Sequence, residues 1–441
     1  MGWRSDAARS ENTVLRGAPR RYSNATLVCV ATVQCIRLEV WYSYGCTWSL
    51  SGGEAPRAKN GKGATWPQRE RRCGRRRLAR LAAASVTAML PLGARFRAPA
   101  FWWERRSLLS DAMLPLAAVY SAASWLHKAT SPPPVHARAP VVCVGSVMVG
   151  GAGKTPVALA VAEHLASSQP NLRVHFLSRG YGGSASGPLR VVAAEHDAVA
   201  VGDEPLLLAA QAPTWVGARR SDTAAAACDA GAQLLLMDDG LQHHSLHRDL
   251  CLLCVDSTER LGNGRVLPAG PLREPLSRAL AKSDAVVAVQ PFAARDGGTG
   301  VDVSDNELRA ALRMPEAMPL LRARMEPEPS SAEPLRGASV LAFSATARPH
   351  RFFDTLLALG CHFPRPPIAL PDHAPIPDAA LDELRRDAAS LGATLATTSK
   401  DFVRLRHGQR EGVSHLAVRL RWLSGSEGAL DGLLHPLIRG A

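Results

Sequence analysis

The residues best suited to binding phosphate in this 441-residue chain form a glycine-rich segment that ends in Gly-Lys-Thr. The segment, residues 145–156, lies between an apolar run at 141–144 and a helix-like run at 157–165. Backbone N–H groups of such a turn bind phosphate oxygens, while the lysine adds charge and the threonine hydroxyl can hold Mg²⁺. Although Met148 replaces a glycine of the strict motif, we predict a P-loop whose phosphate-binding residues are Gly150, Gly151, Ala152, Gly153, Lys154, Thr155 and Pro156.

Two adjacent carboxylates, Asp238 and Asp239, follow another apolar run of four residues. P-loop enzymes place a carboxylate at the end of a neighbouring strand, where it binds Mg²⁺ or the waters around the ion. An acidic turn could also simply connect two elements, with no role in metal binding. We nevertheless expect this pair to share a metal with Thr155, because two carboxylates near a P-loop favour that role.

The stretch that follows, residues 241–249, is rich in glutamine, histidine and arginine. Its three histidines have a spacing that suits zinc, but the sequence offers no further ligand cluster to complete such a site. A loop that contacts substrate explains the same residue types. With other polar residues in turns after strands, the predicted substrate-binding residues are Arg179, Tyr181, Gln242, His243, Arg219 and Arg220.

These groups need a scaffold, and the alternation of strand-like and helix-like runs from residue 141 onward predicts one. The pattern is typical of a doubly wound, mostly parallel α/β sheet of the P-loop NTPase type, which binds ligands at the carboxyl ends of its strands. Besides the run at 141–144, the predicted strands are 173–177, 189–192, 214–216, 234–237, 250–255 and 285–289, and the predicted helices are 155–167, 205–211 and 222–230.

The C-terminal part alternates in the same way and predicts a second, smaller α/β domain. Its expected strands are 340–343, 368–370, 395–397 and 415–418, and its expected helices are 349–359, 378–391 and 427–438. We therefore divide the chain into a basic extension (1–100), an interfacial helix with a linker (101–135), a P-loop domain (136–330) and the smaller domain (331–441).

The net positive charge of the chain comes from its first 100 residues, which hold 18 Lys or Arg and 5 Asp or Glu residues, whereas the rest holds 34 of each. This distribution argues against nucleic acid as a partner of the predicted domains. The extension, with one possible strand at 26–33, resembles an organelle-targeting leader, mitochondrial rather than plastid, or the result of a mistaken upstream translation start, with Met89 as a plausible true start. Without a leader, we expect the cytoplasmic face of an inner membrane.

Residues 101–126 combine aromatic and arginine residues with an apolar run that begins at Leu108. Asp111 and Pro115 interrupt this run, so it lacks the roughly 20 apolar residues of a spanning helix. Aromatic rings beside arginines suit a helix that lies in a membrane interface, and packing on the next domain is the alternative. We expect a protein that is peripheral on a membrane through these residues and has no obligate protein partner.

The motifs occur in an order that resembles the tetraacyldisaccharide 4′-kinases of lipid A biosynthesis, a family of P-loop kinases. Besides the P-loop, the resemblance rests on residues 177–182, 201–205, 237–244, 263–275, 348–354, 371–373 and 397–401, and it covers about residues 101–441. It implies ATP and Mg²⁺ as cofactors and, as substrate, the 4′-hydroxyl of a tetraacyl glucosamine disaccharide 1-phosphate. The chain departs from the family pattern at 344–347, where glycines are usual, and at Ser399, where glutamate is usual.

The resemblance also assigns catalytic roles by position. Asp203 and His373 match the family's base pair, in which the carboxylate orients the imidazole that accepts the proton. Lys154 would neutralise phosphate charge, Arg273 would stabilise the transferring group, and Glu274 would lie near the metal. Because Asp203 and His373 fall in different predicted domains, we expect a site at a domain interface, made when the cleft closes.

Each of these residues also has a purely structural alternative. Asp203 could cap the helix that begins near Pro205, His373 could be a solvated loop residue, and Arg273 with Glu274 could form a surface ion pair. Two other functions compete as well: a P-loop GTPase or ATPase of the metallochaperone type, and a nucleotide-binding membrane-peripheral protein without turnover. The absence of a guanine-reading Asn-Lys-x-Asp motif argues against the first, and intact candidates for every catalytic role argue against the second.

Overall fold

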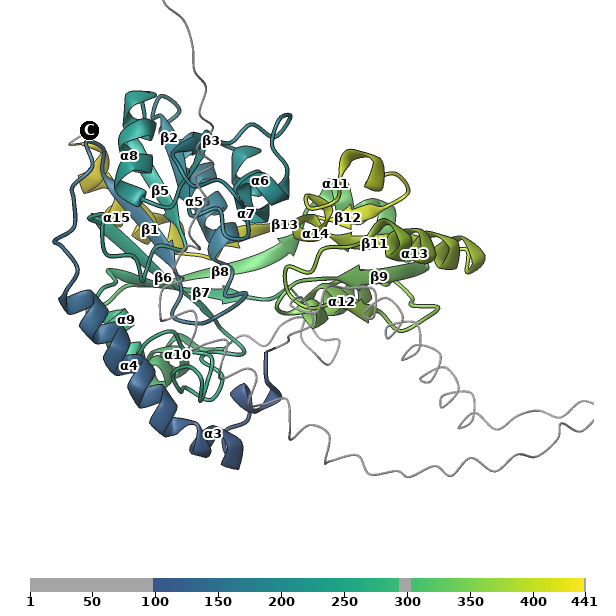
Figure 1. The fold of residues 1–441 in the computed structure, drawn as a ribbon, viewed down its shortest axis with the longest axis horizontal. Coiled ribbons are helices and arrows are strands. Elements are labelled where there is room, and N and C mark those ends of the chain that lie inside the picture. Colours follow the sequence, from purple (N-terminus) through teal and green to yellow (C-terminus); the bar gives the residue numbers. More distant parts are fainter. Residues whose placement is uncertain (1–97, 293–302, 440–441) are drawn as a thin grey trace, which may run out of the picture. The chain divides into compact units, whose positions relative to one another are not determined.

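A nine-stranded sheet forms the larger part of the computed structural model, which describes residues 98–292 and 303–439 (Figure 1). The strands follow the order β13-β8-β7-β6-β1-β5-β2-β4-β3, and all neighbours are parallel except at the two edges, β3 and β13. Their bounds are β1 Val141–Gly145, β2 Val174–Ser178, β3 Leu189–Arg190, β4 Thr214–Val216, β5 Leu234–Asp238, β6 Leu250–Asp256, β7 Ala285–Gln290, β8 Leu320–Pro327 and β13 Val418–Trp422. The predicted doubly wound α/β fold is confirmed.

Helices cover both faces of this sheet because the central strands are buried on both sides. In β1, Val142 and Val144 belong to one apolar core, and Val141 and Cys143 belong to the other. The cysteine pair at 251 and 254 also lies in these cores, as buried strand residues. The helices around the sheet are α5 Lys154–Ser168, α6 Ala198–Val201, α7 Asp203–Ala209, α8 Arg220–Asp229, α9 Leu276–Leu280, α10 Asp305–Leu312 and α15 Ser426–Ile438.

A second, four-stranded sheet has the order β10-β9-β11-β12 and is parallel throughout. Its strands are β9 Val340–Ser344, β10 Ile368–Ala369, β11 Thr394–Thr398 and β12 Ser414–Leu416. The helices of this region are α11 Pro329–Ala332, α12 Pro349–Ala358, α13 Asp378–Ser390 and α14 Ser399–Phe402, with short 3-10 turns η4 Glu333–Leu335 and η5 His407–Gln409. We call residues 328–417 the small-sheet region.

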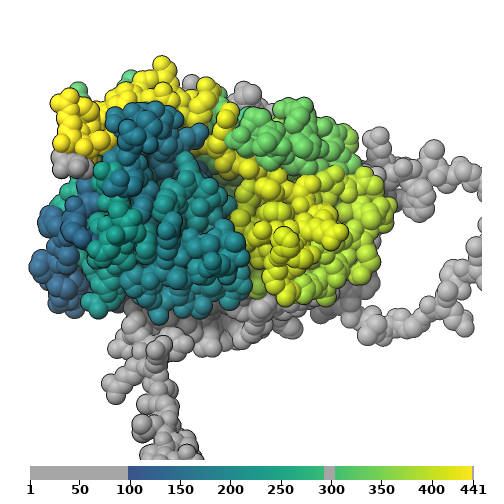
Figure 2. Space-filling model, turned by 90° about the horizontal axis from the view of Figure 1, so that it is seen from above, coloured from purple at the N-terminus to yellow at the C-terminus, as the bar shows by residue number. Residues whose placement is uncertain are grey.

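The chain does not end in the small-sheet region, in contrast to the expected domain 331–441. After β12 it returns to the large sheet, where β13 pairs with β8 and α15 packs on the core beside α5. Figure 2 shows the yellow C-terminal residues in both places, over the blue and teal surface and beside the green one. The predicted strand 415–418 therefore corresponds to the ends of two strands in different sheets, because Ala417 separates β12 from β13.

The strand β8 is missing from the sequence-based prediction, and its pattern explains why. Arg322, Arg324 and Glu326 alternate with less polar residues, and the strand is only partly buried. Its neighbour β13 likewise alternates exposed and buried positions. Both strands lie near an edge of the sheet, where the continuous apolar runs of the central strands are not required.

The N-terminal helical segment consists of η3 Ala100–Trp102, α3 Leu108–Ala112 and α4 Leu114–Ala129, so the predicted single helix is interrupted. The interruption lies at Met113, and Pro115 stands at the start of α4, a position that proline favours. Among the described residues, no helix is both long and apolar enough to cross a membrane. The possible strand at 26–33 and the basic extension lie outside the described residues.

Candidate active site

The glycine-rich segment forms the predicted turn between β1 and α5. Gly150 and Gly153 have φ angles of 86° and 78°, in the left-handed region that glycine adopts without strain, and Lys154 opens the helix. A side chain at Gly153 would also meet Val289 of β7 at 3.2 Å. The two glycines thus leave the backbone N–H groups of the turn exposed to a phosphate group, next to the helix N-terminus.

Thr155, at the end of this turn, and Asp238, the last residue of β5, are two of the predicted metal ligands, and they contact each other. The hydroxyl of Thr155 donates to Asp238 Oδ2 at 2.8 Å, and the other carboxylate oxygen, Oδ1, is buried and has no hydrogen-bond partner. Burial raises the pKa of Asp238 to about 6. A buried carboxylate with an unpartnered oxygen beside a threonine hydroxyl is an oxygen-only ligand set, which is the chemistry that Mg²⁺ prefers.

Asp239 lies between two cations. Lys154 Nζ is 3.5 Å from Asp239 Oδ1, and the guanidinium of Arg273 binds both carboxylate oxygens at 2.9–3.1 Å. Burial alone would raise the pKa of Asp239, but Lys154 and Arg273 outweigh it and hold the pKa below its usual value. Asp239 therefore orients both cations toward the P-loop, and its φ of 53° reflects the sharp turn after β5.

Glu274 is buried and forms an ion pair with Lys282 at 2.5 Å. Gln242 links this pair to the cations, because its amide nitrogen contacts Glu274 at 3.3 Å and its oxygen accepts from Arg273 at 3.1 Å. The alternative of a surface ion pair between Arg273 and Glu274 is wrong: each has a different ionic partner. Whether Glu274 contacts a metal stays a prediction.

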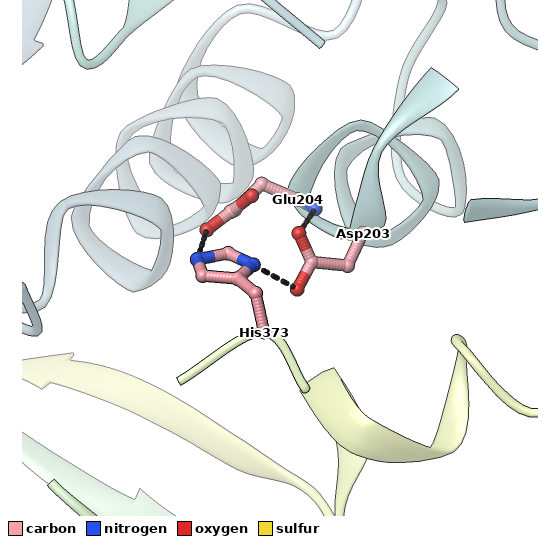
Figure 3. A group of neighbouring side chains, drawn as sticks. All are labelled: Asp203, Glu204 and His373. Atoms are coloured by element: carbon pink, nitrogen blue, oxygen red, sulfur yellow. Dashed lines mark hydrogen bonds and ion pairs between the residues drawn. The ribbon is translucent and has the colours of Figure 1, made fainter. Parts of the chain in front are cut away.

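Asp203 and His373 meet although 170 positions separate them (Figure 3). His373 Nδ1 is 3.1 Å from Asp203 Oδ2, and the carboxylate is only 3% exposed. Asp203 is the first residue of α7, and Gly202 takes the N-cap position, so the capping alternative is not supported. His373 lies in the turn after β10 with a φ of 56°, and its ring packs edge-on to Tyr181. The small-sheet region therefore already contacts the large sheet at this site, where we expected an interface that forms when a cleft closes.

Arginine and lysine side chains from α14 and its C-terminal turn surround this pair. Arg404 binds Asp203 Oδ2 through Nε at 2.8 Å and through Nη2, and it also reaches Asp401. Lys400 contacts Glu204 at 2.6 Å. Burial would raise the pKa of Asp203, but the hydrogen bond from His373 and the nearby cations hold it well below its usual range. Asp203 is a permanent anion beside the imidazole.

A cavity of about 470 Å³ opens beside the P-loop cations. Four of the six predicted substrate-binding residues line it: Arg179, Arg220, Gln242 and His243. Of the other two, Tyr181 contacts His373 instead, and Arg219 is exposed and paired with Asp222 on the surface. Burial lowers the pKa of His243 and of His244 to about 4, so both rings are neutral at pH 7.

Sequence reasoning missed several charged residues of the site. Lys128, Arg278 and Lys282 also line the cavity, and Glu204, Lys400 and Arg404 surround the Asp203–His373 pair. The motif 397–401 includes Lys400 and the motif 201–205 includes Glu204, so both were recognisable, but only the fold shows that they meet. Arg404, Lys128 and Arg278 lie in no motif that distinguishes them from surface residues.

Comparison with known proteins identifies the family of the chain. The family described as Tetraacyldisaccharide-1-P 4′-kinase matches residues 109–438. The chain is 43% identical to a tetraacyldisaccharide 4′-kinase of Rhodospirillum centenum over 78% of its length and 97% of that protein, and 42% identical to one of Rhodospirillum rubrum over 78% and 98%. Its fold is similar to a crystal structure of LpxK from Aquifex aeolicus in complex with ATP, with a TM-score of 0.58 and 24% identity over 75% of this chain and all of that one. The chain therefore belongs to the tetraacyldisaccharide-1-phosphate 4′-kinase family.

Proposed function

We propose that this protein is an ATP-dependent kinase that phosphorylates the 4′-hydroxyl of a tetraacyl glucosamine disaccharide 1-phosphate, with Mg²⁺ as its metal. The observation that carries the proposal is the complete set of phosphoryl-transfer groups around the P-loop. The turn binds phosphates, Lys154 and Arg273 share Asp239, and Asp203 holds a histidine. The metallochaperone and non-catalytic alternatives are not favoured, because the matched relatives are kinases along nearly their whole length.

In this mechanism His373 is the general base. Its Nδ1–H donates to the permanent anion Asp203, which fixes the tautomer and leaves the Nε2 lone pair to accept the hydroxyl proton. As the oxygen attacks the γ-phosphorus, its bond to that phosphorus forms, the bond to the bridging oxygen breaks, and ADP leaves. The imidazolium that results is stabilised by the same carboxylate.

Charge on the transferring group is balanced by residues of the large sheet. Lys154 and Arg273 are oriented by Asp239, so little reorganisation is needed when the phosphates arrive. Thr155 and Asp238 would hold Mg²⁺, since Asp238 Oδ1 is buried without a partner. When bound, the ion neutralises phosphate charge and aligns the β- and γ-phosphates.

The cavity suits an anionic, sugar-like acceptor. Six cationic side chains line it against one carboxylate, Glu274, which Lys282 already neutralises. Lys128 of α4 and Arg278 of α9 border both this cavity and a smaller hollow beside Trp125. This arrangement supports binding of the substrate phosphate near the N-terminal helices, next to an apolar surface.

The N-terminal helices support a position on a lipid surface. Leu108, Val119, Trp125 and Leu126 are 88%, 64%, 56% and 57% exposed, which is unusual for such large apolar side chains. An apolar face beside a basic cavity would keep the acyl chains in the membrane while the sugar enters the site. For the basic extension we propose an organelle address, preferably mitochondrial. A fluorescent fusion of residues 1–100 that stays cytosolic would rule it out.

A transfer assay tests the proposed activity. Purified full-length protein is mixed with γ-labelled ATP, Mg²⁺ and tetraacyldisaccharide 1-phosphate in detergent micelles, and the lipids are separated. We expect a labelled bis-phosphorylated lipid that is absent with the Lys154→Ala variant. An Arg219→Ala variant, which removes an exposed arginine outside the cavity, should retain full labelling and serves as the matched control. Nucleotide binding without lipid labelling would contradict the proposal.

A further inference from the structure

The two nitrogens of His373 have different surroundings. Nδ1 has the conventional carboxylate partner, but Nε2, the atom that must accept the proton, faces three charged groups at longer distances. Lys400 Nζ donates to Nε2 at 3.4 Å, Asp372 Oδ2 lies 3.7 Å from Nε2, and Glu204 Oε1 lies 3.9 Å from it. A base with an anion at each nitrogen would bind its proton too firmly.

Glu204 is the second carboxyl group beside the ring, and its shortest ion pair among the described residues is with a lysine. Lys400 Nζ is 2.6 Å from Glu204 Oε1, and the side chains are 26% and 23% exposed, so solvent screens the pair only partly. Figure 3 shows the imidazole between the carboxylates of Asp203 and Glu204, which follow each other at the start of α7. Lys400 comes from α14, and, like His373, it belongs to the small-sheet region.

We infer that Lys400 is a positioning residue that neutralises Glu204 and, by donating to Nε2 of His373, keeps that nitrogen unprotonated until it accepts the substrate proton. The inference rests on the proposed function. Without the ammonium group, one proton would bind the Glu204–His373 pair, on either partner, and occupy the lone pair. With it, the cation disfavours that proton, and Nε2 remains available to the substrate hydroxyl.

The other charged residues around His373 are present in every variant of Lys400 and Glu204. Asp203 is neutralised chiefly by Arg404, which also binds Asp401, and Lys400 Nζ is a more distant second cation at 3.8 Å from Asp203 Oδ2. Tyr181 contributes only an aromatic edge. Asp372 Oδ2 remains 3.7 Å from Nε2 in all of these variants. Burial raises the pKa of Glu204 to about 7 even with Lys400 beside it, so this carboxylate would take up a proton readily if the cation were removed.

Four proteins test the inference: the unmodified chain, Lys400→Met, Glu204→Gln and the double variant. The acid limb of kcat/KM reports protonation of the base in the free enzyme. For Lys400→Met we expect this limb to move up by about one pH unit, so that activity at a fixed pH on the limb falls by up to roughly tenfold. For Glu204→Gln we expect the acid limb to move to lower pH, because the positive charge of Lys400 is then no longer balanced by Glu204. The double variant should return close to the unmodified profile.

Arg406→Met provides the matched control, since it removes another cation of the same region from an exposed ion pair with Asp378. Its acid limb should not move. A Lys400→Met protein that loses activity equally at all pH values, with no rescue by Glu204→Gln, would overturn the inference. If Lys400→Met does not fold, the direction of the Glu204→Gln shift still decides: an upward or absent shift contradicts the role of Lys400.

A second readout needs no substrate and separates this inference from the proposed function. Diethyl pyrocarbonate acylates only imidazoles with a free lone pair, so the pH dependence of His373 modification, followed by peptide mass spectrometry, reports the state of Nε2. The midpoint should rise in Lys400→Met and fall in Glu204→Gln. Unmoved midpoints count against the inference even if lipid phosphorylation is observed, and moved midpoints support it even if the acceptor differs.

Discussion

The phosphate-binding charges and the base cluster are built in opposite ways. Lys154 and Thr155 come after β1, and Asp238 and Asp239 lie at the end of β5 and directly after it. Because β1 and β5 are neighbours in one sheet, one rigid layer places these residues together. His373 and Asp203 belong to different sheets and are held together by ion pairs from α14 and the turn after it. A site that only binds nucleotide needs the first cluster alone. Chemistry needs both, so binding and turnover should respond differently to mutation.

The largest effect should come from the rigid cluster. Lys154→Ala removes the cation nearest the phosphates and leaves Arg273 alone on Asp239. Loss of a preorganised charge of this kind costs about 10²–10³ in kcat, and we expect at least the upper value here because nucleotide affinity falls as well. Steady-state transfer and calorimetric ATP titration measure the two contributions. Weak transfer with normal ATP affinity would show that Lys154 is not a ground-state phosphate ligand.

The base cluster should separate turnover from binding. His373→Ala is expected to lower kcat about 10²–10³-fold, in the range of general-base catalysis, while the affinity for ATP changes less than twofold. Asp203→Asn should have a similar effect, because the amide can present its N–H to Nδ1 and stabilise the wrong tautomer. Turnover within threefold of the unmodified chain for both variants would remove the pair from the mechanism.

The metal-facing carboxylate predicts a pH dependence of its own. Because burial raises the pKa of Asp238 to about 6, its charge is lost as the pH falls through that value. The Mg²⁺ concentration for half-maximal activity should then rise about tenfold for each pH unit below 6, as expected for proton competition at one site. A Mg²⁺ requirement that is constant from pH 5 to 7.5 would contradict the assignment.

The raised pKa of Asp238 also affects folding: the metal-free protein is less stable at high pH, where this buried carboxyl group is charged. The folded, metal-free protein prefers the protonated carboxyl, so this contribution to stability is complete below about pH 4 and is lost as the pH rises through 6. Asp238→Asn removes the cost of the buried charge and should raise the melting temperature at pH 7.5 by several degrees. Asp222→Asn, at an exposed carboxylate of α8, is the control and should change it by less than one degree.

The smallest effect concerns neither cluster but the surface that brings the lipid to them. Trp125→Ser is expected to weaken binding to anionic vesicles by about tenfold, since burial of a large apolar side chain contributes roughly 1.5–3 kcal/mol. Transfer in detergent should be nearly unchanged. Leu357→Ser, at a 51% exposed residue of α12, serves as the control. Equal loss of vesicle binding in both variants would argue against a specific membrane face.

What the sequence could predict follows the same division. The P-loop, the carboxylates after β5 and the central strands are visible because each is a local pattern, and the structure places them where parallel strands must end. The Asp203–His373 contact was expected only through the family resemblance. Lys400, Glu204 and Arg404 acquire meaning through contacts across 196 to 201 positions, which no local pattern encodes. The sequence did not predict β8, and it predicted only the start of the edge strand β13, because such partly exposed strands have no continuous apolar run.

Because the chain returns to the large sheet, the small-sheet region could be removed without breaking that sheet. The small-sheet region enters after β8 and leaves into β13, and Glu328 donates its backbone N–H to Ala417 O at 2.9 Å, so entry and exit points touch. The small-sheet region is therefore an insertion between two paired strands. A short linker that joins residue 327 to residue 418 would leave the nine-stranded sheet complete. Such a deletion would retain every P-loop and metal-facing residue but no base, leaving a nucleotide-binding protein without an acid–base partner for its acceptor.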